Sequence, residues 1–196
     1  VIVDPIHIDL TDKGASGLYL TTTNVSEANA TLEVKAKIFN ENHEAKQVTL
    51  KAELKHPDQF DAIPNVANPV FDLNAIAPGG NVIETLSETV TIPAGGSFEF
   101  KKEVTISNPR LWKGKEDPYR YLVDFTILQN NIALDNVSEY VGFRFFEVNK
   151  QGFFLNGNHY PLRGVSRHQD YFSMGNAVTE KEHNEDFGMM YDIGVN

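Results

Sequence analysis

The decapeptide PLRGVSRHQD, residues 161–170, holds the densest group of side chains in this sequence that could take part in chemistry. An apolar run opens into charged and hydrogen-bonding groups, namely Arg163, Ser166, Arg167, His168, Gln169 and Asp170. An imidazole and a carboxylate at the end of a strand can hydrogen-bond a ligand, but a lone histidine there is more often a polar residue satisfied within its own fold. The residues alone leave both interpretations open.

A shared metal ion is a further possibility, because His168 and Asp170 lie two residues apart. Protein zinc sites need at least three protein ligands, and no third ligand lies nearby in the sequence. We therefore predict no metal site in this segment. The chain contains no cysteine, which excludes disulfides and thiol-based catalysis.

The composition excludes some classes of partner. The formal net charge is −10, and an acidic chain repels phosphate backbones, so we predict no nucleic-acid partner. No run of about 18 apolar residues occurs, so we predict no membrane span. The opening VIVDPIHIDL lacks a starting Met and an intact signal peptide, so we expect a processed or cut chain, and its cellular compartment stays open.

Period-2 alternation of apolar and polar residues dominates the first 143 residues and predicts the scaffold. It is clearest in TLEVKAKIF (31–39), VTLKAEL (48–54), SFEFKKEVTI (97–106) and YRYLVDFTIL (119–128). Such strands have one buried and one solvated face, as in antiparallel sheets. About seven of them predict an immunoglobulin-like antiparallel β-sandwich over residues 1–143. The Pro-rich stretch 56–81 is predicted to be a long loop.

The pattern changes over residues 144–196. Residues 145–160 predict a hairpin whose second turn is Asn156-Gly157. LRGVSRH, residues 162–168, predicts a strand, and Thr179 with Glu182 predicts the capping box of a helix that ends near Gly194. A strand followed by a helix is one βα unit of a parallel sheet, which cannot bury itself. We therefore expect the chain to end just inside a second, α/β domain.

Several of these motifs carry a family resemblance. The segments Gly142–Arg144, Leu155–Gly157, Arg163–Asp170 and Asp186–Asn196, with Gly175 and residues 108–127, closely resemble glycoside hydrolase family 2. That family includes β-galactosidases, β-glucuronidases and β-mannosidases. Ser166 stands where the family usually has Asn, and Gln169 replaces the common Glu. The resemblance implies that residues 144–196 are the truncated beginning of a (β/α)8 catalytic barrel, with 162–168 as its first strand.

The resemblance also implies roles for the residues of the decapeptide. The ends of barrel strands carry the active site, so His168 would hydrogen-bond a sugar hydroxyl, and Asp170 would lie nearby. Arg163 and Arg167 would support them through buried charge pairs. We expect the longer protein to bind a β-linked glycoside, and a divalent cation such as Mg²⁺ near its active site.

The resemblance implies a retaining β-glycosidase, with a β-galactosidase favoured, which uses two glutamates on later barrel strands. Neither Asn40-Glu41 nor Asn184-Glu185 has the expected strand context, so no catalytic residue is predicted within this chain, and the chain alone should be inactive. Residues 145–196 are expected to self-associate or to dock on the sandwich. The alternative is a non-enzymatic immunoglobulin-like module for carbohydrate binding or adhesion.

Overall fold

The computed structural model describes residues 6–9, 15–57 and 80–196. The predicted Pro-rich loop at 56–81 lies mostly outside these residues. Two compact units divide the described chain. The sandwich unit takes residues 6–9, 15–57, 80–111 and 119–144, and the hairpin–helix unit takes residues 112–118 and 145–196.

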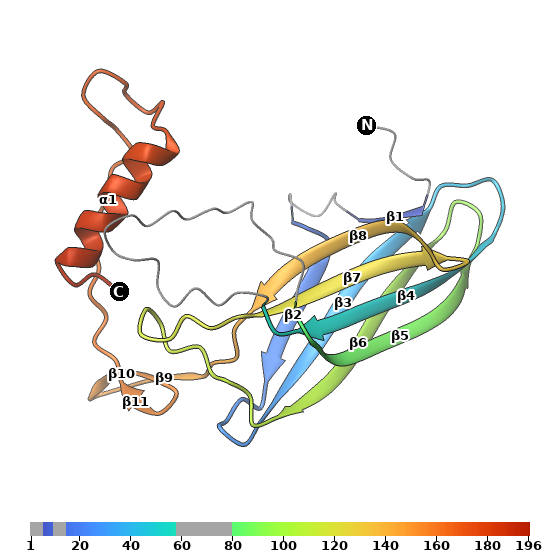
Figure 1. Cartoon of the computed structure of the whole chain (residues 1–196), viewed down its shortest axis with the longest axis horizontal. Coiled ribbons are helices and arrows are strands. Elements are labelled where there is room, and N and C mark those ends of the chain that lie inside the picture. The colour runs from blue at the N-terminus through green and yellow to red at the C-terminus, as the bar shows by residue number, and fades with distance from the viewer. Residues whose placement is uncertain (1–5, 10–14, 58–79) are drawn as a thin grey trace. The chain divides into compact units, whose positions relative to one another are not determined.

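The sandwich unit consists of eight antiparallel strands in two sheets (Figure 1). They are β1 (Ile6–Ile8), β2 (Leu18–Thr23), β3 (Asn29–Asn40), β4 (Lys46–Lys55), β5 (Val82–Ile92), β6 (Ser97–Ser107), β7 (Tyr121–Gln129) and β8 (Ile132–Val141). In one sheet, β3 pairs with β1 and β2 and also with β6; the other sheet has the order β5-β4-β7-β8. The predicted mainly-β, antiparallel architecture is confirmed.

The core lies between the two sheets and is made by the residues that the alternation predicts to face inward. They include Leu32, Val34, Ala36 and Ile38 of β3, Val48, Leu50, Ala52 and Leu54 of β4, and Tyr121, Val123, Phe125 and Ile127 of β7, each at most 3% exposed. Phe100 of β6 meets Phe125 edge to face, with ring centroids 5.1 Å apart. Burying this much apolar surface is the main favourable term in holding two sheets together.

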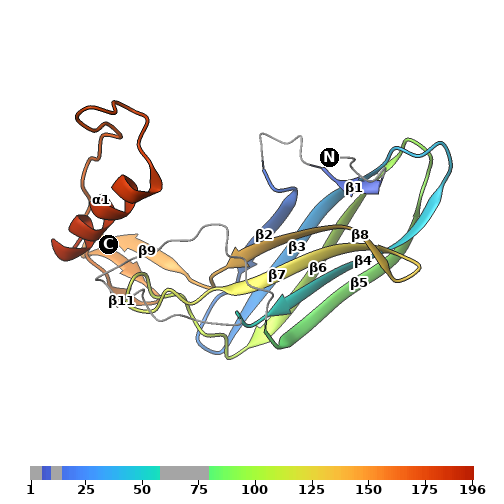
Figure 2. The same cartoon turned by 45° about the horizontal axis from the view of Figure 1, so that its top comes forward.

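Polar contacts join the two sheets at their edges, where the long strands run alongside one another (Figure 2). Glu88 of β5 and Lys102 of β6 form an ion pair of 3.1 Å between one sheet and the other. At the opposite side, β1 meets β8, where the Ile8 N–H donates to the Asp135 carboxylate at 2.9 Å. The sandwich is therefore held by charge-assisted contacts at both margins as well as by its core.

The hairpin–helix unit begins with three short strands, β9 (Phe146–Asn149), β10 (Gly152–Leu155) and β11 (Asn158–His159), which pair in the order β11-β10-β9. The turn between β10 and β11 has positive φ at both Asn156 (50°) and Gly157 (78°). Consecutive positive φ values are what a type I′ hairpin requires, and Asn-Gly adopts them at least cost. The predicted hairpin is confirmed.

Helix α1 (Glu180–Asp192) has the ends that the sequence predicts. The Thr179 N–H donates to the Glu182 carboxylate at 3.0 Å, which forms the capping box. At the other end, Gly194 has φ of 85°, and its N–H donates to the Tyr191 carbonyl, while Val195 N–H donates to the Met190 carbonyl. These two bonds form a Schellman motif. No helix in the described part of the chain is long and apolar enough to cross a membrane.

The prediction of a strand at residues 162–168 is wrong for this structure, which shows no strand over residues 160–170. A parallel strand exists only through hydrogen bonds to its neighbours, and among the described residues no strand pairs with this segment. Of the βα unit predicted from the sequence, the structure shows the helix, and the preceding segment lies outside any sheet.

Candidate functional site

The predicted site residues differ in their exposure. His168, Asp170 and Arg163 are exposed, whereas Arg167 is partly buried. Solvent-facing imidazole and carboxylate groups are available to hydrogen-bond a polar ligand. The one partly buried side chain among these four, Arg167, contacts helix α1.

Arg167 forms an ion pair with Asp186 of α1. Both the Nε and Nη2 atoms of Arg167 lie 2.6 Å from Asp186 Oδ2, and each side chain is only 15% exposed. Short N–H to carboxylate contacts of this kind are stronger than neutral hydrogen bonds. The pair ties the residue directly before His168 to the middle of the helix.

Two further side chains complete this cluster. Arg167 Nη2 lies 2.9 Å from His183 Nδ1, and the Tyr171 hydroxyl donates to Asp186 Oδ1 at 3.2 Å. An arginine N–H can only donate, so His183 Nδ1 is the acceptor in this contact. Burial, together with the Asp186 carboxylate, raises the pKa of Tyr171, which keeps its hydroxyl protonated.

Neither His183 nor Tyr171 was predicted as a site residue from the sequence. The signal that could have found His183 is helical spacing: His183, Asp186 and Phe187 stand at i, i+3 and i+4 and therefore share one face of α1. The Arg167 guanidinium carbon lies 5.7 Å from the centre of the Phe187 ring, and His183 is stacked on the same ring at 6.5 Å.

Arg163 is held at the base of the segment by Asn196. The Arg163 N–H donates to Asn196 Oδ1 at 2.8 Å, and the Asn196 N–H donates to the Arg163 carbonyl at 3.1 Å. Asn196 Nδ2 also donates to the Pro161 carbonyl at 2.8 Å. One asparagine therefore closes the stretch from residue 161 to residue 196 into a loop that contains the candidate site residues and α1.

The LNG turn is fixed by Asn156, which is 9% exposed. Its side chain accepts from the Phe145 N–H at 3.1 Å and donates to the Trp112 carbonyl at 2.9 Å. In the same connecting segment, the Lys115 ammonium donates to the Val195 carbonyl at 3.1 Å and lies over the Tyr191 ring. Residues 112–118 thus contact both the hairpin and the end of α1.

The two Asn-Glu pairs of the chain do not form a pair of facing carboxylates. Glu41 lies 3.3 Å from the His7 ring, and Glu185 lies 3.8 Å from Lys181 on α1. Within residues 6–9, 15–57 and 80–196, no group of three or more His, Cys, Asp or Glu side chains is arranged to hold a metal ion. The Mg²⁺ that the resemblance implies for a longer protein stays a prediction.

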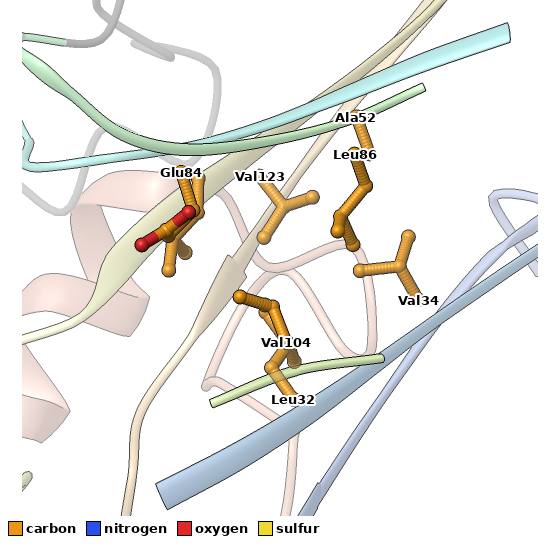
Figure 3. A pocket seen from close by; sticks show the side chains of 8 residues that line it. Leu32, Val34, Ala52, Glu84, Leu86, Val104 and Val123 are labelled. Carbon is orange, nitrogen blue, oxygen red and sulfur yellow. The ribbon is translucent and has the colours of Figure 1, made fainter. Parts of the chain in front are cut away.

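A small apolar cavity lies inside the sandwich, between β3 and β6 on one side and β4, β5 and β7 on the other (Figure 3). Its lining consists of Leu32, Val34, Ala52, Leu54, Glu84, Leu86, Val104 and Val123. Glu84 is the one charged residue among them, and its surroundings offer no second polar group for chemistry. The cavity is a packing gap of the core, and none of the residues predicted to bind a ligand lines it.

The chain resembles proteins of known classes along most of its length. Residues 16–144 match the family described as glycosyl hydrolases family 2. A β-glucuronidase of Bacteroides fragilis is 36% identical over 138 residues, which cover 67% of this chain and 20% of that protein. The β-galactosidase BoGH2A of Bacteroides ovatus is 28% identical over 193 residues, covering 98% of this chain and 20% of that protein.

The fold of this chain also resembles part of a solved glycosidase structure. β-Glucuronidase 2 of Bacteroides uniformis, covalently bound to cyclophellitol-6-carboxylate aziridine, superposes with a TM-score of 0.83 and 32% identity, over 99% of this chain and 21% of that one. The chain spans about a fifth of the length of the curated relatives described above. With a family match over most of its residues, a shared fold and relatives of both glycosidase types, this chain belongs to glycosyl hydrolases family 2.

Proposed function

We propose that this chain is a non-catalytic portion of a retaining β-glycosidase, and that it supplies one wall of the sugar site through His168. The observation that carries the proposal is the exposed His168–Asp170 end of a family motif, anchored to α1 by Arg167. In this proposal the imidazole of His168 hydrogen-bonds a hydroxyl of the bound sugar, and Asp170 orients it or a neighbouring group.

Retaining hydrolysis needs two carboxyl groups about 5–5.5 Å apart, one as acid/base and one as nucleophile. The inhibitor attached covalently to the Bacteroides uniformis enzyme supports a nucleophile in that relative. The described part of this chain offers no such carboxylate pair at Glu41 or Glu185. The chain alone should therefore bind sugar weakly and cleave none.

Two substrate classes are the candidates. A β-galactoside is the class predicted from the sequence, and the BoGH2A relative supports it over nearly the whole chain. A β-glucuronide is the second candidate, supported by the higher identity of the Bacteroides fragilis relative. A glucuronide carries a carboxylate where a galactoside carries a hydroxymethyl group, and the two also differ in configuration at C4. A site for the second must therefore supply an additional cationic or hydrogen-bonding partner for the carboxylate.

The test uses the longer protein that contains these residues. Wild type, His168→Ala and the matched surface control His43→Ala would be assayed on nitrophenyl β-galactoside, β-glucuronide and β-mannoside, with the 196-residue chain alongside. We expect cleavage of one substrate, no cleavage by the chain alone, and at least a tenfold loss of kcat/KM, about 1.4 kcal/mol, for His168→Ala only.

Other outcomes separate the alternatives. A longer protein that cleaves none of the three glycosides but binds a sugar would favour the non-enzymatic carbohydrate-binding module. If the longer protein is active and His168→Ala leaves its kcat/KM unchanged, the motif has a structural role and His168 is not part of the sugar site.

Self-association of the chain by itself is part of the proposal. Large apolar side chains of the hairpin–helix unit are exposed, among them Phe146 (66%), Val148 (70%), Phe172 (101%) and Ile193 (72%). Patches of this kind favour association in water, and a second copy is the partner always present at high concentration. Sedimentation should show a dimer or larger species that Phe172→Ser and Ile193→Ser together reduce; a strict monomer at high concentration would contradict this.

A further inference from the structure

Arg167 is the junction between the candidate sugar-binding residues and helix α1. Its guanidinium contacts three groups on one helix face: the Asp186 carboxylate at 2.6 Å, His183 Nδ1 at 2.9 Å and the ring of Phe187. The segment around it has no strand partner among the described residues, and its backbone hydrogen bond to Asn196 lies at Arg163, four residues before Arg167. The side chain of Arg167 holds the part of the segment next to His168 against α1.

We propose that Asp186 and His183 are positioning residues of the sugar site, which act through Arg167 to hold His168 and Asp170 in one orientation. This inference rests on the proposed function, since it concerns the same site. Neither residue need touch the substrate. Asp186 supplies the charge that holds the guanidinium, and His183 supplies a second acceptor that selects its rotation about the Cδ–Nε bond.

The protonation state of His183 is part of the geometry. Because the arginine N–H donates to Nδ1, only the neutral imidazole with its proton on Nε2 fits this contact. The proposal requires this tautomer, which is also the commoner form of a free neutral imidazole, so the variants of Asp186 and His183 carry the test.

The first experiment uses the 196-residue chain labelled with ¹⁵N, at pH 8. We expect the His183 ¹⁵N shifts of an unprotonated Nδ1 and a protonated Nε2. Asp186→Asn should shift the ring and amide resonances of His168, with the hairpin amides unchanged. Glu185→Gln is the matched control, because it removes one negative charge from the same helix at an exposed side chain that pairs with Lys181.

Two substitutions of His183 separate positioning from packing. His183→Gln keeps an acceptor in reach of Arg167 and should restore most of the His168 spectrum, whereas His183→Leu keeps the bulk without the acceptor and should not. Equal spectra for these two variants, or a wild-type His168 spectrum in Asp186→Asn with α1 intact by circular dichroism, would overturn the inference. If Asp186→Asn unfolds α1, the comparison of His183→Gln with His183→Leu still tests the positioning role.

The second experiment uses the longer protein and distinguishes this inference from the proposed function. Asp186→Asn and His183→Leu should lower kcat about tenfold or more with little change in KM, and His183→Gln should recover activity. An inactive wild-type protein would contradict the proposed function, and the positioning of His168 would then be judged from the NMR experiment alone. If the wild-type enzyme is active and the Asp186 and His183 variants lose only thermal stability, the positioning role is contradicted and the proposed function stands.

Discussion

The carboxylate of Asp135 on β8 accepts a hydrogen bond from the backbone N–H of Ile8 on β1 at 2.9 Å, although 127 residues separate them. Strand β1 is only three residues long and pairs with β3 through Ile6–Ile8. The outward N–H of Ile8 would otherwise face the margin of the sandwich without a strand partner. A side chain of the other sheet therefore completes the hydrogen bonding of a short edge strand.

Removal of this acceptor should loosen β1. A hydrogen bond to a charged group contributes about 1.5–3 kcal/mol, and Asp135 is partly exposed, so Asp135→Ala should lower the free energy of unfolding by about 1–2 kcal/mol. Urea unfolding followed by circular dichroism of the strands measures the change. Asp135→Asn keeps an oxygen acceptor and should lose less; an equal loss for both variants would mean that charge, and not the hydrogen bond, matters.

His7 should make the stability of the same strand depend on pH. Its Nδ1 lies 3.0 Å from the Ile8 carbonyl and its Nε2 lies 3.3 Å from Glu41, so both ring nitrogens face oxygen acceptors and the doubly protonated ring fits best. Burial alone would lower the pKa of His7, but the Ile8 carbonyl and the Glu41 and Asp135 carboxylates outweigh it, so the pKa is raised above the ordinary 6.5.

The sign of the effect follows from linkage. A pKa that is higher in the folded than in the unfolded state gives stability that is fully present below about pH 6.5 and is lost as the pH rises through the folded value. The free energy of unfolding, measured from pH 5.5 to 8.5, should fall over this window in wild type. The fall should be smaller in Glu41→Gln and absent in His7→Gln; an unchanged slope in His7→Gln would refute the assignment.

Asn40 organises two turns from a fully buried position. Its Nδ2 donates to the carbonyls of Glu44, Ile92 and Pro93 at 3.0, 2.9 and 3.1 Å, and its Oδ1 accepts from Asn42. Asn40→Ala leaves these carbonyls without their donor and should cost about 1–3 kcal/mol of unfolding free energy. Asn42→Ala removes only the outer contact and serves as the control, with a loss well under 1 kcal/mol expected; a similar loss for both would contradict the central role of Asn40.

Two glycines of the hairpin–helix unit should respond to alanine in opposite directions. Gly194 has φ of 85°, and a Cβ there would lie 3.4 Å from Arg163 Nη1. Left-handed backbone costs an L-residue about 1–2 kcal/mol, so Gly194→Ala should fray the end of α1. Gly188 lies inside α1 with open space around a Cβ, so Gly188→Ala should stabilise the helix by about 0.5–1 kcal/mol. Amide exchange within α1 measures both, and a stabilising Gly194→Ala would overturn the cap assignment.

The sequence by itself predicted the features that depend on local signals. The inward faces of β3, β4 and β7 follow from strict alternation, because successive side chains of a strand point to opposite faces. The Asn156-Gly157 turn, the Thr179–Glu182 capping box and the Gly194 cap each depend on residues a few positions apart. The family resemblance came from several short motifs in a fixed order along the chain, of which residues 163–170 are one.

The tertiary structure decided what depends on contacts between distant parts of the chain. Strand pairing requires a partner, so residues 162–168, read from the sequence as a strand, have no ladder in the described chain. The same holds for the contact of Asp135 with Ile8, and for the grouping of Arg167 with His183 and Asp186. Periodicity shows which face of an element a side chain occupies, but only the folded chain determines which groups meet there, because hydrogen bonds and ion pairs form over a few ångströms between residues that the sequence separates by 16 to 127 positions.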